Sequence, residues 1–275
     1  MREKRKQTAQ ETLKIQQQGF YTVQGRRVDI STMQKHSETA SYLIKPMDGQ
    51  KLIKDLPSHG HDSKPQYEII NASTVKAIID EAKTDERVAA LNFASAKKPG
   101  GGFLNGAMAQ EEALAACSGL YNTQIIHNEY YGKNHACGTM MYTDHAIYSP
   151  DVVFFRDENS GLLTTPVTAS ILTLPAVNYG QVIIKRENTD KAKQVMKDRM
   201  RLALAILAHE RNDNIILGAY GCGIFRNNPD DVARWWQELL QDEGYEKYFK
   251  RVLFVIKDRP DGKNIMAFQR VFGCN

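Results

Sequence analysis

Strand-like and helix-like segments alternate along this chain from Tyr67 onwards, and this alternation constrains the fold more than any other feature. Strands are predicted over residues 67–73, 88–95, 147–157, 167–177, 214–217 and 251–258, which are rich in β-branched and aromatic residues. Helices are predicted over residues 74–85, 110–120, 191–213 and 229–242, the third with a clear apolar stripe. Such alternation is typical of an α/β fold with a largely parallel sheet.

The first 65 residues do not show this alternation of strand and helix patterns. Residues 1–30 are predicted to form a helix followed by a polar turn, and residues 31–65, which hold three prolines and two glycines, are predicted to be irregular. We therefore expect a helical and irregular extension over residues 1–65 and one α/β domain over residues 66–275.

Charge, cysteine spacing and hydropathy limit the partners and the cellular compartment that we expect for this chain. The net charge is +4, but the first six residues carry four basic side chains against Glu3, so the remainder is nearly neutral. Direct nucleic-acid binding is therefore not indicated, and the basic start is interpreted as a solvated helix end. The four cysteines form no CxxC pair, and no apolar run approaches the length of a membrane span. These features predict a cytoplasmic protein with reduced thiols and no membrane contact.

Glycine clusters follow two of the predicted strands. Gly100–Gly102 follow the strand at 88–95, and Gly218, Gly221 and Gly223 follow the strand at 214–217. In an open α/β sheet, ligands bind beyond the carboxyl ends of strands, and glycine lets successive N–H groups converge on an anion. Either loop alone is equally well explained as a tight turn, but the two together favour a phosphorylated ligand such as a diphosphate. Neither fits a nucleoside-triphosphate loop or a dinucleotide fingerprint.

Two adjacent carboxylates, Glu111 and Glu112, lie early in the helix after the first glycine cluster. Acidic residues in a first helical turn are routine, because they interact favourably with the helix dipole. Neighbouring helical residues point about 100° apart, so a functional pair would divide two roles. One side chain would hold a sugar hydroxyl and the other would face the scissile bond. Mutual repulsion raises the pKa of one member of a close pair, which suits a general acid.

The spacing GGG, seven residues, then QEE resembles the signature of the poly(ADP-ribose) glycohydrolases. The segments LNFASAKKPGGGF, YSPDVVFFRD, GAYGCGIFRNNP and, near the start, QTAQETLKIQQQGFY are similar to the microbial-type branch of that family. The resemblance extends from about residue 7 to residue 230. It implies a macrodomain fold, a three-layer α/β/α sandwich with a mixed, largely parallel central sheet, preceded by an N-terminal helical extension.

The resemblance also implies roles for individual residues. Glu112 would be the catalytic acid that protonates the leaving oxygen at the ribosyl C1″ and then helps to activate water, and Glu111 would hold ribose hydroxyls. The implied substrate-binding residues are Asn92, Gly100, Gly101, Gly102, Gln110, Gly221, Cys222, Gly223, Ile224 and Phe225. Oxocarbenium-like cleavage of a glycosidic bond needs a well-placed acid and a carboxylate environment. No metal and no cofactor is implied.

Several other residues have two readings. Cys222 is either a small residue chosen for space, which we favour, or a thiol activated in an anion site. His127, His135 and Cys137 lack a fourth ligand at a suitable spacing for a metal. Most tyrosines of residues 121–148 are expected to pack, with one available to stack on adenine. Trp235 and Trp236 are expected at the rim and in the core.

The sequence thus predicts a monomeric hydrolase that releases ADP-ribose from poly(ADP-ribose) or from the macromolecules that carry it. Three alternatives stay open at this point. The first is a macrodomain that binds ADP-ribose without catalysis, although binding alone does not need two adjacent acids. The second is a hydrolase of another ADP-ribose linkage, on mono-ADP-ribosylated protein or on a nucleobase. The third, least favoured, is a nicotinamide-dinucleotide oxidoreductase.

Overall fold

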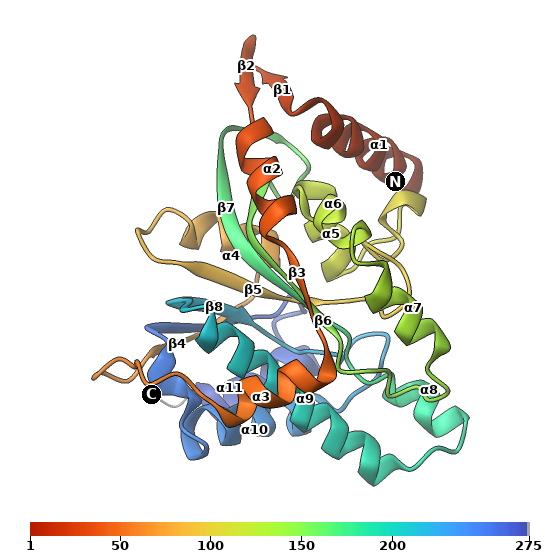
Figure 1. Cartoon of the computed structure of the whole chain (residues 1–275), viewed down its shortest axis with the longest axis vertical. Coiled ribbons are helices and arrows are strands. Elements are labelled where there is room, and N and C mark those ends of the chain that lie inside the picture. Colours follow the sequence, from red (N-terminus) through yellow and green to blue (C-terminus); the bar gives the residue numbers. More distant parts are fainter. Residues whose placement is uncertain (274–275) are drawn as a thin grey trace.

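A mixed seven-stranded sheet forms the centre of the computed structural model, which describes residues 1–273 (Figure 1). Its strand order is β3-β6-β7-β5-β8-β9-β4. The four pairings from β7 to β4 are parallel, and the two pairings at the β3 end are antiparallel. The strands are β3 (Tyr42–Ile44), β4 (Gln66–Ile70), β5 (Val88–Phe93), β6 (Ala146–Arg156), β7 (Leu162–Leu174), β8 (Asn214–Leu217) and β9 (Arg251–Val255). The predicted mixed, largely parallel sheet is confirmed.

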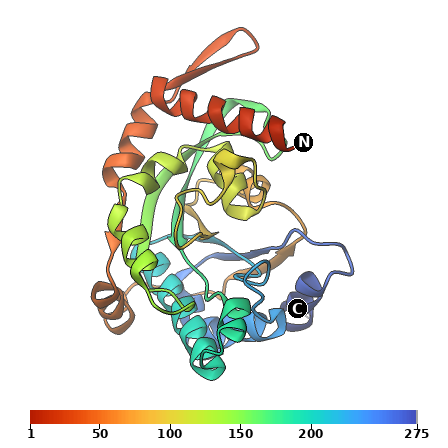
Figure 2. The same cartoon turned by 90° about the vertical axis from the view of Figure 1, so that its right-hand side faces the viewer.

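Helices cover both faces of this sheet. Neighbouring residues of β9 show the two sides: Val252 and Phe254 pack in one apolar core, whereas Leu253 and Val255 pack in the other. The first core is closed by α3 (Pro46–Lys54), α8 (Tyr179–Ile184), α9 (Thr189–His209), α10 (Pro229–Gln237) and α11 (Lys263–Phe272), and the second by α4 (Thr74–Glu81), α5 (Gln110–Cys117) and α6 (Leu120–Ile125). Figure 2 shows these layers from the side, with α9 below the sheet and α5 above it. The predicted α/β/α sandwich is confirmed.

The N-terminal part is more regular than its sequence suggested. It contains α1 (Arg2–Gln18), a hairpin of β1 (Phe20–Val23) and β2 (Arg26–Asp29), α2 (Ser31–Ala40), β3 and α3. The prediction of an irregular segment is therefore wrong for residues 31–54. Pro46 lies in the first turn of α3, where proline starts a helix rather than breaks one. Because β3 pairs with β6, the extension shares the main sheet, and a boundary at residue 65 stays a prediction.

Both glycine clusters leave the same edge of the sheet. Strands β5 and β8 are parallel neighbours, so the segments that follow Phe93 and Leu217 start side by side. The segment after β5 leads through a short 3₁₀ turn, η1 (Phe103–Asn105), into α5, and the segment after β8 leads into α10. The remaining elements are α7 (Asn128–Ala136), η2 (Glu238–Asp242) and η3 (Tyr245–Tyr248). Within residues 1–273, no helix is both long and apolar enough to cross a membrane.

Candidate active site

The first glycine loop uses its main-chain donors inside the protein. Gly100 N donates to Oε1 of Gln124 (2.8 Å), Gly101 N to the carbonyl of Lys98 (3.0 Å), and Gly102 N to Oε1 of Glu112 (2.9 Å). Gly100 and Gly101 have φ angles of 61° and 59°, a region that glycine enters at little cost. The loop is thus shaped around side chains of the site, and its three N–H groups are already paired.

Gly101 is the point at which the two acids meet the loop. A Cβ atom on Gly101 would collide with Oε1 of Glu112 and would lie 3.0 Å from Oε2 of Glu111. Both carboxylates therefore approach the same stretch of main chain, and only a residue without a side chain leaves room for them. This contact explains why the triple glycine lies so close in sequence to the acidic pair.

Glu111 points into a buried polar network. Its Oε1 accepts hydrogen bonds from the side-chain amides of Asn92 and Gln124 (3.2 Å each), and its Oε2 accepts one from Ser95 N (2.7 Å). The same two amides donate to the hydroxyl of Thr173 on β7 (3.2 Å each). Asn92 is fully buried, so it lies behind Glu111. A direct contact between Asn92 and a ribose stays a prediction.

Gln124 joins the loop to the acid and was missed by the sequence analysis. Its side chain accepts from Gly100 N through one end and donates to Glu111 and Thr173 through the other. It is fully buried on α6, fourteen positions after Gln110 and outside every motif considered. Nothing in its sequence neighbourhood marks it, because its role follows from the packing of α6 against α5.

Burial changes the proton affinity of Glu111. The loss of hydration raises the pKa of its carboxyl to about 8, the three donors from Ser95, Asn92 and Gln124 oppose this rise, and the charge of Glu112 adds to it. At neutral pH the group therefore largely keeps its proton. A protonated carboxyl can donate as well as accept, which suits a contact with sugar hydroxyls.

This shift predicts a pH-dependent stability. From the ordinary pKa of 4.5 up to about 8, the folded chain keeps the Glu111 proton while the unfolded chain loses it, so raising the pH favours unfolding. The free energy of unfolding should fall by up to about 1.4 kcal/mol per pH unit from this group. Glu111→Gln should flatten that fall when thermal unfolding is compared at several pH values across the window. Glu112→Gln removes only the smallest of the causes that raise this pKa, so it should narrow the window slightly and keep most of the slope. An unchanged slope in Glu111→Gln would contradict the assignment.

Gln110 fixes α5 to the sheet. Its Oε1 accepts from Phe93 N and its Nε2 donates to the carbonyl of Leu91, at 2.8 Å in each case. The side chain thus binds the main chain at the end of β5. Its predicted contact with substrate stays a prediction. The side chains of the QEE motif thus have three different partners: Gln110 binds the main chain of β5, Glu111 the buried polar network, and Glu112 the first glycine loop.

The second glycine loop has unpaired main-chain donors. Among residues 1–273, the N–H groups of Gly221, Gly223, Ile224 and Phe225 have no hydrogen-bond acceptor. Gly223 is exposed, and Ile224 is 85% exposed. Successive unpaired N–H groups at the end of a strand form a concave donor surface for an anion. The two glycine loops therefore differ: the first holds the acids, and the second offers donors.

The second loop also carries two of the predicted side chains. Cys222 is buried, and burial raises the pKa of its thiol to about 12, which favours the reading as a small packed residue over a reactive thiolate. The ring of Phe225 lies 6.1 Å from that of Tyr142, centroid to centroid. Tyr220 in this loop packs against Phe93 at the end of β5 (5.6 Å), which links the second loop to the strand that leads to the acids.

The remaining candidates are mainly structural. Trp236 is fully buried and donates to the carbonyl of Gly218 (3.1 Å), so it holds the start of the second loop against the core. His135 Nε2 lies 3.0 Å from the carbonyl of Lys97. Cys117, the last residue of α5, is buried in the core between this helix and the sheet. Within the described chain, no three His, Cys, Asp or Glu side chains are grouped as metal ligands would be.

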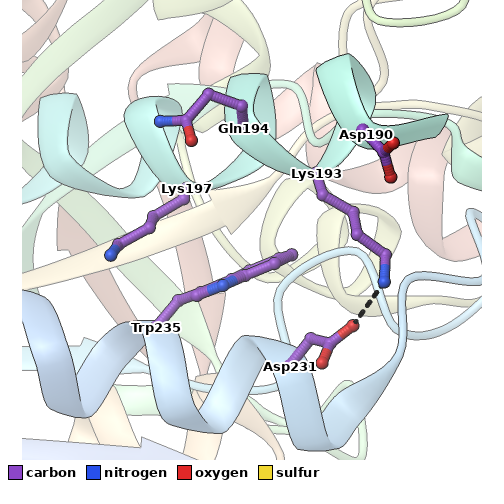
Figure 3. Close-up of a pocket in the computed structure, with 6 residues that line it drawn as sticks. All are labelled: Asp190, Lys193, Gln194, Lys197, Asp231 and Trp235. Atoms are coloured by element: carbon purple, nitrogen blue, oxygen red, sulfur yellow. Dashed lines mark ion pairs between the residues drawn. The ribbon is translucent and has the colours of Figure 1, made fainter. Parts of the chain in front are cut away.

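A groove of about 300 Å³ lies elsewhere, between α9 and α10 (Figure 3). It contains none of the predicted site residues. Lys193 of α9 pairs with Asp231 of α10 across it (3.3 Å), and the ring of Trp235 lies on the α10 side. The other lining residues are Asp190, Gln194 and Lys197. Both of its lysines are paired with acids of the facing segment, Lys193 with Asp231 and Lys197 with Glu238 (2.6 Å), so we interpret it as a junction between two helices and place the candidate site at the two glycine loops.

A family comparison agrees with this geometry. Residues 9–157 match the model of the microbial-type PARG catalytic domain, a range that includes the first glycine loop, both acids and Gln124. A search of curated proteins found no match.

Solved structures match nearly the whole chain. Poly(ADP-ribose) glycohydrolase from Thermomonospora curvata is 35% identical with a TM-score of 0.93, and the match covers 98% of this chain and 100% of that one. The same enzyme bound to the inhibitor ADP-HPD matches at 34% identity and a TM-score of 0.91 over the same shares. The enzyme from Deinococcus radiodurans in complex with ADP-ribose is 38% identical with a TM-score of 0.81, over 86% of this chain and 96% of that one. This chain therefore belongs to the microbial-type poly(ADP-ribose) glycohydrolase family.

Proposed function

We propose that this chain hydrolyses the ribosyl glycosidic bond of poly(ADP-ribose) and releases ADP-ribose. The observation that carries the proposal is the meeting of Glu111 and Glu112 at Gly101, beside a second loop with unpaired N–H groups. One loop offers donors for a pyrophosphate, and the other places an acid where the attached sugar would lie. The relatives from Thermomonospora curvata and Deinococcus radiodurans, which bind ADP-HPD and ADP-ribose, support this reading.

In the proposed complex, the second loop binds the pyrophosphate. The N–H groups of Gly221, Gly223, Ile224 and Phe225 donate to its oxygens, and the half-buried ring of Phe225 packs against the nucleotide. Substrate anchored there extends its distal ribose towards the first loop, because both loops leave neighbouring parallel strands. Glu111 binds the ribose hydroxyls, with its orientation fixed by Asn92, Gln124 and Ser95.

Glu112 performs the proton transfers in this proposal. Its carboxyl donates a proton to the leaving oxygen while the C1″–oxygen bond breaks and positive charge develops on the sugar ring. The resulting carboxylate then accepts a proton from the water that attacks C1″, which restores the acid and yields free ADP-ribose. Gly102 N holds Oε1 of Glu112 in place through both steps.

The partners in this proposal are poly(ADP-ribose) and the macromolecules that carry it. The chain acts on them as a monomer in the cytoplasm. Three described cysteines, Cys117, Cys137 and Cys222, are free thiols, which agrees with a reducing compartment. No metal ion or cofactor takes part in the steps that we propose.

Release of free ADP-ribose from a substrate panel tests the function. The panel contains poly(ADP-ribose), peptides mono-modified on Glu, Ser and Arg, and modified DNA, with a Glu112→Ala variant as the blank. We expect rapid release from the polymer by the wild-type chain and none by the variant. Tight ADP-ribose binding without release from any substrate would instead indicate a non-catalytic binding module. Release only from one mono-modified substrate would indicate a different linkage.

A further inference from the structure

The basic start of the chain lies against the short turn that follows the first glycine loop. Nε of Arg2 donates to the carbonyl of Asn105 (3.0 Å), and Nε of Arg5 donates to that of Gly106 (2.8 Å). The packing is close, because a Cβ on Gly106 would lie 2.5 Å from the carbonyl oxygen of Arg2. Figure 2 shows the N-terminal end of α1 above this part of the molecule. From the sequence, these residues were interpreted as a solvated helix end, so this contact was not expected.

The same loop segment is hydrogen-bonded to the residue that holds the catalytic acid. Gly102, whose N–H binds Glu112, accepts at its carbonyl from the N–H groups of Asn105 (3.0 Å) and Ala107 (3.1 Å). The turn at residues 102–106 thus binds Glu112 through Gly102 N, which we call its inner side, and it binds Arg2 and Arg5 through the carbonyls of Asn105 and Gly106, which we call its outer side. The arginines are therefore placed just beyond the bond that Glu112 would cleave.

The charge in this region is available to a ligand. Lys6 pairs with Glu3 (3.1 Å), whereas neither Arg2 nor Arg5 forms an ion pair within residues 1–273. Because Nε of each arginine is bound to a carbonyl, the guanidinium is oriented while its two terminal nitrogens remain for another acceptor. Arginine presents such a fork to phosphate in a bidentate manner and keeps its charge at every physiological pH.

We propose that Arg2 and Arg5 form a binding subsite for the pyrophosphate of the ADP-ribose unit on the leaving side of the cleaved bond. This inference rests on the proposed function, which places the released unit between the two glycine loops. The leaving oxygen belongs to the adenosine ribose of the next unit, and the pyrophosphate of that unit is one sugar away. A polymer that continues past Glu112 brings two negative charges to the outer side of the loop, where the arginines lie.

Binding in an inactive background tests the subsite without turnover. In Glu112→Gln, the Arg2→Gln/Arg5→Gln double substitution should weaken poly(ADP-ribose) binding about tenfold at low salt. The slope of log affinity against log salt should become shallower by about 1.4, because each phosphate contact on a single strand contributes about 0.7. Affinity for ADP-ribose alone should stay unchanged, since that ligand occupies only the site between the glycine loops.

Two further variants separate charge from support of the loop. Arg26→Gln/Arg27→Gln removes two exposed arginines from β2 and should leave polymer binding and its salt slope unchanged. Arg2→Lys/Arg5→Lys keeps the charge but not the geometry of the Nε bonds, and should keep most of the slope. Polymer binding unaffected by Arg2→Gln/Arg5→Gln, or an equal loss of ADP-ribose affinity, would overturn the subsite. Failure of the wild-type chain to release ADP-ribose from polymer would overturn the function, and is measured separately.

Discussion

Replacing Glu112 by glutamine is expected to lower kcat for ADP-ribose release by about 10³ or more, because proton transfer by a positioned side chain contributes about 10²–10⁴. Affinity for ADP-ribose should stay nearly unchanged. Glutamine has the same shape, and its side-chain oxygen can still accept from Gly102 N, so the loop keeps its anchor. Steady-state release from poly(ADP-ribose) gives kcat, and calorimetry with ADP-ribose gives the affinity.

Glu187→Gln is a matched control for this substitution. Glu187 is also half-buried, and its carboxylate also accepts a main-chain N–H, that of Met140 (3.0 Å), but it lies outside the two glycine loops. Its replacement should therefore change stability by an amount similar to that of Glu112→Gln and leave kcat at the wild-type level. Glu112→Ala, which also removes the anchor at Gly102, should lose affinity as well as turnover. Substantial turnover by Glu112→Gln would remove this residue from the role of catalytic acid.

The parts of the fold that could be predicted have local signals. The alternation of strand and helix patterns from Tyr67 onwards fixes the class, and the two glycine clusters locate the loops at the edge of the sheet. The helix at 46–54 was missed because Pro46 and Gly49 were interpreted as breaks, although Pro46 begins that helix. The helix at 31–40 contains neither proline nor glycine, and it was missed because only Met33 and Ala40 in it are apolar, which is too few for a helical stripe. Strand β3 has only three residues, too few for a periodic pattern.

The parts of the site that could not be predicted depend on contacts between distant segments. Gln124 reaches Gly100 and Glu111 only because α6 packs beside α5, and Arg2 reaches Asn105 across 103 positions of sequence. The different roles of the two glycine loops could not be predicted from the sequence either. Their compositions are similar, and only the folded chain distinguishes the loop with paired N–H groups from the loop with unpaired ones. Sequence motifs thus located the acids, and tertiary structure explains how the acids are held.

The second large effect is expected at Gly101. Gly101→Ala introduces a methyl group that collides with Oε1 of Glu112 and lies 3.0 Å from Oε2 of Glu111, at a φ angle of 59°. The side chains of Glu111 and Glu112 can move more easily than the main chain at Gly101, so the substitution should displace both carboxylates from the sugar. A displacement of about 1 Å can cost about 10²-fold in rate, and we expect a loss of at least that size in kcat/KM for ADP-ribose release.

Gly25→Ala separates this effect from backbone strain. Gly25, in the β1–β2 hairpin, has a similar φ angle of 74° but no heavy atom within 4 Å of the position of an added Cβ. Both substitutions place a Cβ in the left-handed region, which costs about 1–2 kcal/mol. Gly25→Ala should therefore lower the melting temperature at full activity, whereas Gly101→Ala should lose stability and activity together. Equal activity of the two variants would mean that Glu111 and Glu112 do not need the space at Gly101, and the triple glycine would then serve the turn alone.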